Sequence, residues 1–397
     1  MGFFSGTISY SRFRIPGYRP GDFSEEFLER LATMGMGSQK VATKDGVNIG
    51  WIAGDHILDK NFQLEKNIIN ETLSFALRVD VNRLPPDLLR AYTAEELDAL
   101  ALANPSGRPS KRQRKEAKEA AQDRLEGEAK DGRFLKRKMI PVLWDGSSGE
   151  VFFGSSSVAM IDRFVDQFEA TFGKKVVPVT AGSLAFQLAE TAGMPRGVED
   201  AEPSAFLPGK SPGEVSWMPD GECRDFMGNE FLVWLWYQLD GGSDEIKLSD
   251  GTSAALLLTK SMNLECPRGQ TGRQSVHSEG PARMPEAFRS LLEGKWPRKV
   301  GMIVVRHQQQ YEFNFSAETM SIGSLKLPAT EESEERARLD ERVNQLRAYL
   351  ETMDLLYEAF ISRRIVATQW KKDLGKMQKW VARQGEEEKA ESGKGEG

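Results

Sequence analysis

The segment from Ser110 to Lys130 is the feature that most constrains how this chain of 397 residues can fold. Its residues are polar and favour helix, and Leu125 is its only large aliphatic residue. A helix with so little apolar surface cannot be packed into a core. A stretch rich in Pro, Gly and Ser, from Asn104 to Pro109, precedes it. We therefore predict a projecting helical arm within residues 105–138.

Charge is segregated along the chain. The formal net charge is −6. From Arg108 to Lys138, however, there are 12 basic and 6 acidic residues, and from Ile361 to Gln384 there are 7 basic residues and one acid. Phosphate binding responds to the local field rather than to the total charge. The acidic total therefore does not argue against a nucleic-acid partner.

Apolar patterns on both sides of the arm predict an α+β fold with antiparallel sheets and packed helices. From Leu73 to Val81 apolar residues alternate with polar ones, so we expect a half-buried strand with an outer face formed by Thr72, Ser74, Arg78 and Asp80. Capping patterns predict helices that start at Asp22 and at Thr93. The other predicted elements are strands over residues 7–15, 140–145, 150–153, 175–179, 300–305, 311–315 and 322–327, and a helix over residues 158–172.

The C-terminal part is predicted to be helical over residues 331–384. Its apolar residues repeat at alternating spacings of four and three, and they are Leu339, Val343, Leu346, Leu350, Met353, Tyr357 and Phe360. Such a heptad seam specifies a packed helix, which either docks on its own domain or forms a dimer contact. Residues 385–397 are rich in Glu, Lys and Gly, and we expect them to be a disordered acidic tail.

These patterns divide the chain into an N-terminal α+β lobe (1–104), the arm (105–138) and a central and C-terminal α+β lobe (139–330). The helical segment and the tail follow. Within the second lobe, residues 181–285 are hard to interpret. Pro and Gly are frequent from Pro195 to Gly221, which predicts long loops. The aromatic run from Phe231 to Tyr237 has an ambiguous period.

Neither a catalytic nor a metal-binding pattern is evident. Cys223 and Cys266 do not form a CxxC pair, and the three histidines lie far apart (His56, His277 and His307). The sequence has no GxSxG, P-loop, GxGxxG or HExxH motif. It also lacks a signal-peptide pattern and any apolar run long enough to span a bilayer. We expect a non-enzymatic cytoplasmic protein that needs no cofactor and no metal.

Four blocks, taken in order, resemble the RdgC family of recombination-associated bacterial proteins. The first is Gly37-Ser38-Gln39 with Gly50-Trp51, and the second is the charged arm. The third runs from Phe134 through Trp144-Asp145, Val151-Phe152-Phe153 and the helix to Phe172 as far as Val176-Val177-Pro178-Val179. The fourth comprises Leu292-Glu293-Gly294-Lys295, the strand to Val305, residues 308–315 and Gly323-Ser324-Leu325-Lys326-Leu327. Residues 181–285 and the basic segment after Phe360 depart from the family pattern.

The resemblance implies a homodimer that forms a ring by head-to-head contact, with a basic central hole that encloses duplex DNA. It also implies DNA binding with little sequence preference, an association with the bacterial nucleoid, and a role in limiting the access of the recombinase RecA to DNA. Binding of single-stranded DNA stays open.

The candidate DNA-binding residues fall into three groups. The arm offers Arg108, Lys111, Arg112, Arg114, Lys115, Lys118 and Arg124. A second cluster is Arg133, Phe134, Lys136, Arg137 and Lys138. The third is a basic stripe of Lys372, Lys376, Lys379 and Arg383 beside the apolar residues Val366, Trp370, Leu374, Met377 and Val381. Cationic side chains neutralise phosphates and release counterions, which gives affinity without sequence information.

Each group has a simpler structural explanation. Acidic residues four positions away could pair with the arm cations. Phe134 could stack on a base or be the first core residue of a strand. The C-terminal stripe could meet DNA, an acidic partner or a membrane surface, or be the solvated rim of a docked helix. Trp51, Trp234, Trp236 and Tyr237 are expected in the core. Ser155 to Ser157 could hold a phosphate but fit plain helix capping better.

Two further functions remain open from the sequence. A metal-dependent nuclease would use acidic residues as ligands and would cleave DNA in the presence of magnesium or manganese. A scaffold without a DNA ligand would use its basic segments to bind acidic proteins.

Overall fold

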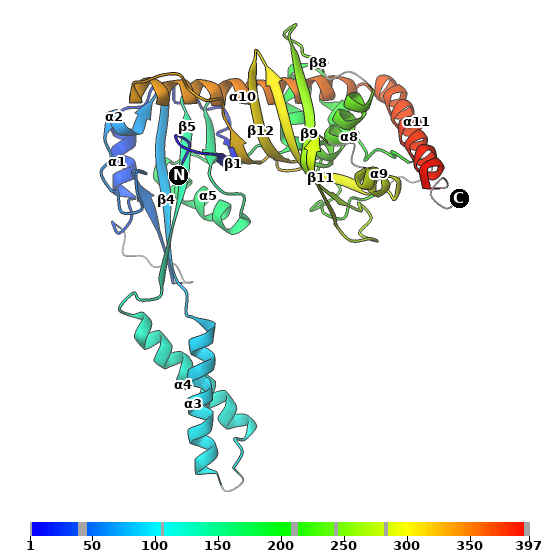
Figure 1. Ribbon diagram of the computed structural model, residues 1–397. Helices are drawn as coiled ribbons and strands as arrows, with labels where there is room; N and C mark the ends of the chain where they lie inside the picture. The colour runs from blue at the N-terminus through cyan, green and yellow to red at the C-terminus, as the bar shows by residue number, and fades with distance from the viewer. Residues whose placement is uncertain are drawn as a thin grey trace.

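One antiparallel sheet forms the frame of this computed structural model, which describes residues 2–38, 46–104, 107–207, 213–241, 245–281 and 285–392. The strand order in these residues is β10-β9-β11-β12-β13-β1-β6-β5-β4-β2, with three short strands added at its margins. Helices cover the sheet and one helical hairpin projects from it, so the fold is α+β (Figure 1).

The N-terminal half of the sheet carries two helices on one face. Its strands are β1 (Ile8–Arg14), β2 (Val47–Ile52), β3 (Ile68–Ile69), β4 (Thr72–Asn82), β5 (Leu135–Asp145), β6 (Glu150–Phe153) and β7 (Val177–Pro178). Helices α1 (Glu25–Thr33) and α5 (Val158–Phe172) pack on it, and the short α2 (Leu64–Asn67) leads into β3. The rings of Phe168 and Phe172 lie 5.0 and 5.1 Å from that of Trp144 at the centre of this core.

The C-terminal half of the sheet is built from later strands. These are β8 (Glu245–Lys247), β9 (Ser253–Glu265), β10 (Gln274–Pro281), β11 (Trp296–Arg306), β12 (Gln309–Ser316) and β13 (Ile322–Lys326). The helices packed with it are α6 (Ala181–Thr191), α7 (Arg196–Glu199), α8 (Phe226–Asp240), α9 (Pro285–Leu292), α10 (Glu335–Arg364) and α11 (Ala367–Ser392). Phe231 of α8 contacts Tyr357 and Phe360 of α10 at the centre of this second core.

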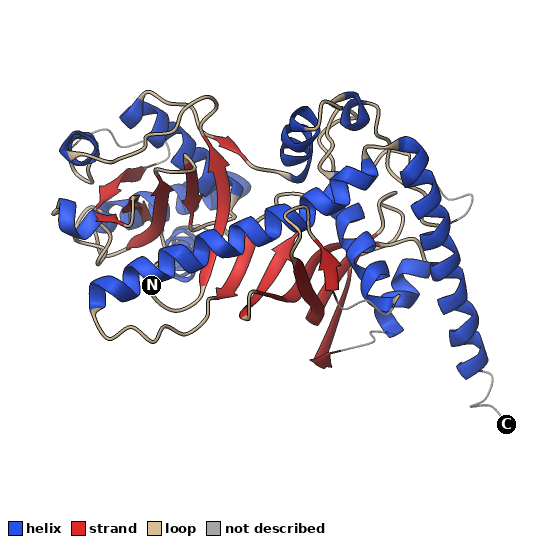
Figure 2. Ribbon diagram, turned by 90° about the horizontal axis from the view of Figure 1, so that it is seen from above, coloured by secondary structure: helices blue, strands red, loops and turns tan. Residues whose placement is uncertain are grey.

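Helix α10 joins the two halves. Its 30 residues span about 45 Å and cross the whole sheet in Figure 2. Along this length, Arg347 pairs with Asp145 at 2.7 Å, Tyr357 donates to the carbonyl of Ala181 at 2.9 Å, and Arg364 binds the fully buried Glu230. The heptad seam is thus confirmed as one long helix, and it docks on its own chain.

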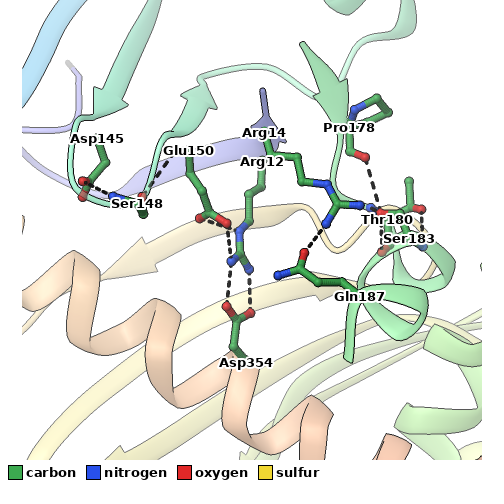
Figure 3. A network of polar contacts seen from close by, with 10 residues as sticks. All are labelled: Arg12, Arg14, Asp145, Ser148, Glu150, Pro178, Thr180, Ser183, Gln187 and Asp354. Carbon is green, nitrogen blue, oxygen red and sulfur yellow. Dashed lines mark hydrogen bonds and ion pairs between the residues drawn. The ribbon is translucent and has the colours of Figure 1, made fainter. Parts of the chain in front are cut away.

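Strand β1 and helix α10 meet at a buried arginine, Arg12 (Figure 3). Its guanidinium donates two hydrogen bonds of 2.6 and 2.7 Å to Glu150 of β6 and two of 2.6 Å to Asp354 of α10. Burial by itself would lower the pKa of Arg12, but the carboxylates of Asp354 and Glu150 hold it well above the ordinary value. The guanidinium is therefore a permanent charge inside the fold.

Most predicted elements are confirmed, because their periodicity reflects a local core face. β1, the β5–β6 hairpin, α5, the β11–β12 pair and β13 occur where they were expected. The strand predicted over residues 175–179 is reduced to the two residues of β7. Pro and Gly do mark irregular backbone between Asp200 and Asp225, although residues 208–212 lie outside the described part.

Several expectations were wrong. Helix α1 has its N-cap at Ser24 rather than Asp22. Helix α3 (Pro86–Ala103) begins before Thr93, since proline suits the first turn. The aromatic run 231–237, whose period the sequence left ambiguous, lies inside α8. Helix α11 continues to Ser392, into the predicted disordered tail, where Glu, Lys and Ala favour helix. Residues 393–397 lie outside the described residues, as does Gln39.

The outer face of β4 was also predicted wrongly. Thr72, Arg78 and Asp80 are buried and Ser74 is half-buried, rather than exposed as the alternation indicated. Arg78 forms a bidentate pair with Asp80 at 2.6 and 2.8 Å, and its third donor reaches the carbonyl of Ile57 at 3.1 Å. A paired charge can be covered by a loop, which an alternating pattern does not reveal.

None of the described helices is both long and apolar enough to cross a membrane.

Replacing Arg12 with alanine is expected to lower the free energy of unfolding by about 3 kcal/mol, because two carboxylates would lose their shared buried partner. Urea unfolding followed by circular dichroism measures the change. The matched control is Arg30→Ala, whose ion pair with Glu26 is solvent-exposed and should contribute less than about 0.5 kcal/mol. Equal effects of the two substitutions would contradict the structural role of Arg12.

Asp145 should make stability depend on pH. Burial alone would raise the pKa of its carboxyl, but hydrogen bonds from Arg347, Ser147 and Ser148 outweigh burial and lower it. The stabilisation is therefore present above the unfolded-state pKa of about 3.9 and is lost as pH falls through the lower folded-state value. At pH 7, the free energy of unfolding of wild type should exceed that of Asp145→Asn by about 2 kcal/mol. Urea titrations at several pH values should show this difference shrinking below about pH 4. A difference that stays constant with pH would contradict the role of the Asp145 carboxylate.

Candidate nucleic-acid interface

The arm is a hairpin of two helices, α3 and α4 (Lys111–Ala129), that projects from the sheet at the ends of β4 and β5 (Figure 1). Helix α4 starts with a capping box in which the backbone N–H of Gln113 donates to Ser110 Oγ, at 3.3 Å, and the N–H of Ser110 donates to the Gln113 side chain, at 2.9 Å. The projection and α4 were predicted. Helix α3, which the sequence division placed in the N-terminal lobe, packs against α4.

A narrow stripe holds the hairpin together. The buried residues of α4 occur at every fourth position, and they are Ala117, Ala121, Leu125 and Ala129. Helix α3 has no buried residue. Between the helices, the guanidinium of Arg124 lies 3.8 Å from the centre of the Tyr92 ring and 2.9 Å from a Glu95 oxygen. The Tyr92 hydroxyl donates to Glu128 at 2.8 Å. Arg124 is therefore a structural cation of the arm.

Four of the exposed cations of α4 share one face, termed here the arm face. Lys111, Arg114, Lys115 and Lys118 follow one another at positions i, i+3, i+4 and i+7, so their side chains lie on one side of the helix. Arg112 and Lys115 also pair with Glu116 and Glu119 at 2.7 and 3.5 Å. Lys115 is thus a paired member of the arm face, whereas Arg112 forms its pair beside that face. Arg108 is exposed in the loop before it.

A second group of cations lies where the arm meets the sheet, and we call it the neck cluster (Lys136, Arg137 and Lys138). It forms because β4 and β5 stay paired in register as far as Asn82 and Leu135, beyond the apolar core. All three side chains are exposed, and Arg137 lies 3.7 Å from Asp80. Lys136 and Lys138 are opposite Val81 and Val79, whereas Arg137 points to the other face of the ribbon.

The remaining residues of this predicted cluster have mixed roles. Arg133 pairs with Asp131 at 2.6 Å and with Glu128 at 3.4 Å. Phe134 is half-buried, and its carbonyl accepts a hydrogen bond from the N–H of Arg83 at 3.2 Å. The Phe134 ring is therefore neither a fully buried core residue nor a fully exposed surface on which a base could stack. Arg83 is an exposed cation that could not be found from the sequence, because it lies outside the basic segments 108–138 and 361–384.

The third group lies on α11, at the end of the molecule away from the arm (Figure 1). Lys372, Lys376, Lys379 and Arg383 are exposed, and Arg383 lies 3.9 Å from Asp240. Of the apolar residues predicted beside them, Trp370, Met377 and Val381 are buried and Val366 and Leu374 are half-buried. The structure therefore does not bring the three predicted groups together. Lys371, which is also exposed, was missed.

Other residues weighed from the sequence are structural. Trp51, Trp234 and Trp236 are buried and Tyr237 is half-buried. The Trp51 indole donates to Thr171 Oγ1 at 2.7 Å. Ser157 is the N-cap residue of α5, but no hydrogen bond of its side chain caps the helix. These findings confirm the expected aromatic cores.

A groove of about 1310 Å³ lies between α10 and the β1 and β6 strands, and its lining includes Arg12, Glu150 and Asp354 (Figure 3). Arg12 binds Glu150 and Asp354, Arg347 binds Asp145, and Arg14 donates to Gln187. Arg19, which is exposed, also lines the groove. Most of the groove's arginines therefore have acceptors within the fold. Across the described ranges, no group of three or more His, Cys, Asp or Glu side chains is arranged to hold a metal ion.

Comparison with protein-family models finds no match to this chain, and comparison with curated proteins finds none either.

Replacing Leu125 with alanine should destabilise the arm by about 2 kcal/mol, because it truncates the one buried residue of α4 that is larger than alanine. Hydrogen–deuterium exchange should rise in residues 86–129 and stay unchanged in α5 and α10. The matched control is Leu58→Ala, whose side chain lies outside the arm and is 60% exposed. Faster exchange throughout the protein would contradict an arm that packs independently of the two cores.

Proposed function

We propose that this protein binds DNA without sequence preference through the arm face and the neck cluster. The observation that carries the proposal is an arm that projects from the sheet with cations at i, i+3, i+4 and i+7 of α4. A projecting helix costs a protein apolar packing, so an exposed ligand-binding role explains it better than stability does. Contacts of Lys and Arg with phosphates supply affinity on any sequence.

The shape of the chain supports a clamp around duplex DNA. The arm projects from one end of the body, beneath the sheet and away from α10 (Figure 1). The neck cluster lies on β5 where the arm leaves the sheet. One chain provides only part of an enclosure, so a second copy would be needed to complete it.

Apolar surface on the arm supports self-association. Leu102, close to the tip, is 90% exposed, and Leu88 is 36% exposed. Contact with a second arm would remove the Leu102 side chain from water. We therefore propose an RdgC-like ring-forming homodimer that is associated with the nucleoid and limits the access of RecA to the DNA it encloses.

The experiment is a fluorescence-anisotropy titration of labelled duplexes of several sequences at increasing salt. If about six phosphates are neutralised, the plot of log K against log salt should have a slope of about −5, and affinity should fall about 1000-fold between about 50 and 200 mM. All sequences should bind alike. Adding magnesium or manganese should leave the DNA intact, whereas cleavage would favour a nuclease.

Charge reversal on the arm face locates the site. Lys111→Glu/Arg114→Glu/Lys118→Glu should weaken binding at least about tenfold on every sequence and reduce the salt slope by about 3. Lys111→Arg/Lys118→Arg is the matched control and should retain binding, because it keeps the charges. An unchanged slope in the reversed variant would remove the arm from the site, and no binding at low salt would overturn the proposal.

A further inference from the structure

Helix α11 is fixed to the body through one face only. Trp370, Met377, Trp380 and Val381 are buried, and the helix packs against α8, α9 and α10. The indole of Trp370 donates to Ser204 Oγ at 2.9 Å, and the indole of Trp380 donates to Asp240 at 2.7 Å. These contacts determine which face of α11 points away from the body.

The outward face is a basic stripe formed by Lys371, Lys372, Lys376, Lys379 and Arg383, all exposed. It extends over about 18 Å, three turns of helix. Asp373, the single acid between residues 361 and 384, lies on the docked face, where it is 5% exposed and pairs with Arg363 at 2.8 Å. The stripe therefore contains no acid of α11 itself, and the carboxylate that meets it is Asp240, 3.9 Å from Arg383 at its end.

The basic stripe and the arm face are separated by the body of the protein. The arm leaves the molecule beneath one end of α10, and α11 follows the other end (Figures 1 and 2). Duplex DNA has a persistence length of about 50 nm, so a short segment cannot bend round the body to reach both surfaces. DNA on the stripe would have to be a different segment from DNA on the arm.

We propose that the basic stripe of α11 binds the phosphate backbone of a second duplex, so that the protein bridges two DNA segments. This inference rests on the proposed DNA-binding function of the arm. It adds a second site for the same class of ligand at the opposite end of the chain.

The chemistry of the stripe favours DNA over the other polyanions. Membrane-surface helices insert an apolar face into the lipid, but in α11 the large apolar side chains are buried or half-buried in the protein. Protein interfaces depend on apolar and aromatic anchors that become buried, and the stripe consists of long cationic side chains. A row of cations without such anchors suits a phosphate backbone.

A bead-capture experiment tests the bridge. One duplex is attached to beads, the full-length protein is added, and retention of a second, fluorescent duplex is measured. Wild type should retain it. Lys372→Glu/Lys376→Glu/Lys379→Glu should reduce retention about tenfold, while its anisotropy-measured affinity for a single duplex stays within about twofold, since the arm is unchanged. Lys372→Arg/Lys376→Arg/Lys379→Arg should behave as wild type.

The outcomes separate the two proposals. Binding of one duplex without capture of a second, or capture that survives the α11 reversal, would overturn the bridge and leave the arm site intact. No binding of any duplex would overturn the proposed function itself. Co-sedimentation with phosphatidylserine vesicles that the α11 reversal abolishes, together with no capture of DNA, would show that the stripe serves a membrane instead.

Discussion

The grip of Arg12 on Glu150 and Asp354 is the interaction on which the arrangement of the other elements depends. The partners lie 138 and 342 residues away in the chain, and four donors of one guanidinium bind both. A buried charge must be paired, so β1, β6 and α10 have to meet at this point. Because β1 also joins the two halves of the sheet, the same contact holds both cores in one body.

The body of the protein sets the direction in which the arm projects. β4 and β5 remain in register over 11 residue pairs, from the buried core to the neck, and therefore act as a stiff base for the hairpin. The hairpin itself buries only small residues and Leu125. Such a thin contact leaves most of the α4 surface exposed, which is what a phosphate-binding helix requires and what a core helix would not permit.

The fold also determines where the segregated charges of the chain lie in space. The acidic excess of the chain lies outside two basic segments, and the structure places these segments at opposite ends of α10. Within the arm, pairs such as Arg112 with Glu116 reduce the local positive charge without removing it. On α11 the one acid between residues 361 and 384, Asp373, pairs with Arg363 on the docked face, so the basic stripe contains no acid of its own. The two surfaces therefore differ in charge density as well as in position.

Local sequence by itself determined where β1, α5, β11, β12 and α10 occur, because the spacing of apolar residues within one element decides whether it forms a helix or a strand. It also determined that residues 110–130 project, because a helix with almost no apolar residues cannot be buried. It also identified the basic clusters. Only the tertiary structure decided that apolar α3 belongs to the arm, that the Arg78–Asp80 pair is covered, and that α11 faces away from α4. These outcomes depend on contacts between residues distant in the chain, and neither residue spacing nor composition encodes which charges those contacts bury.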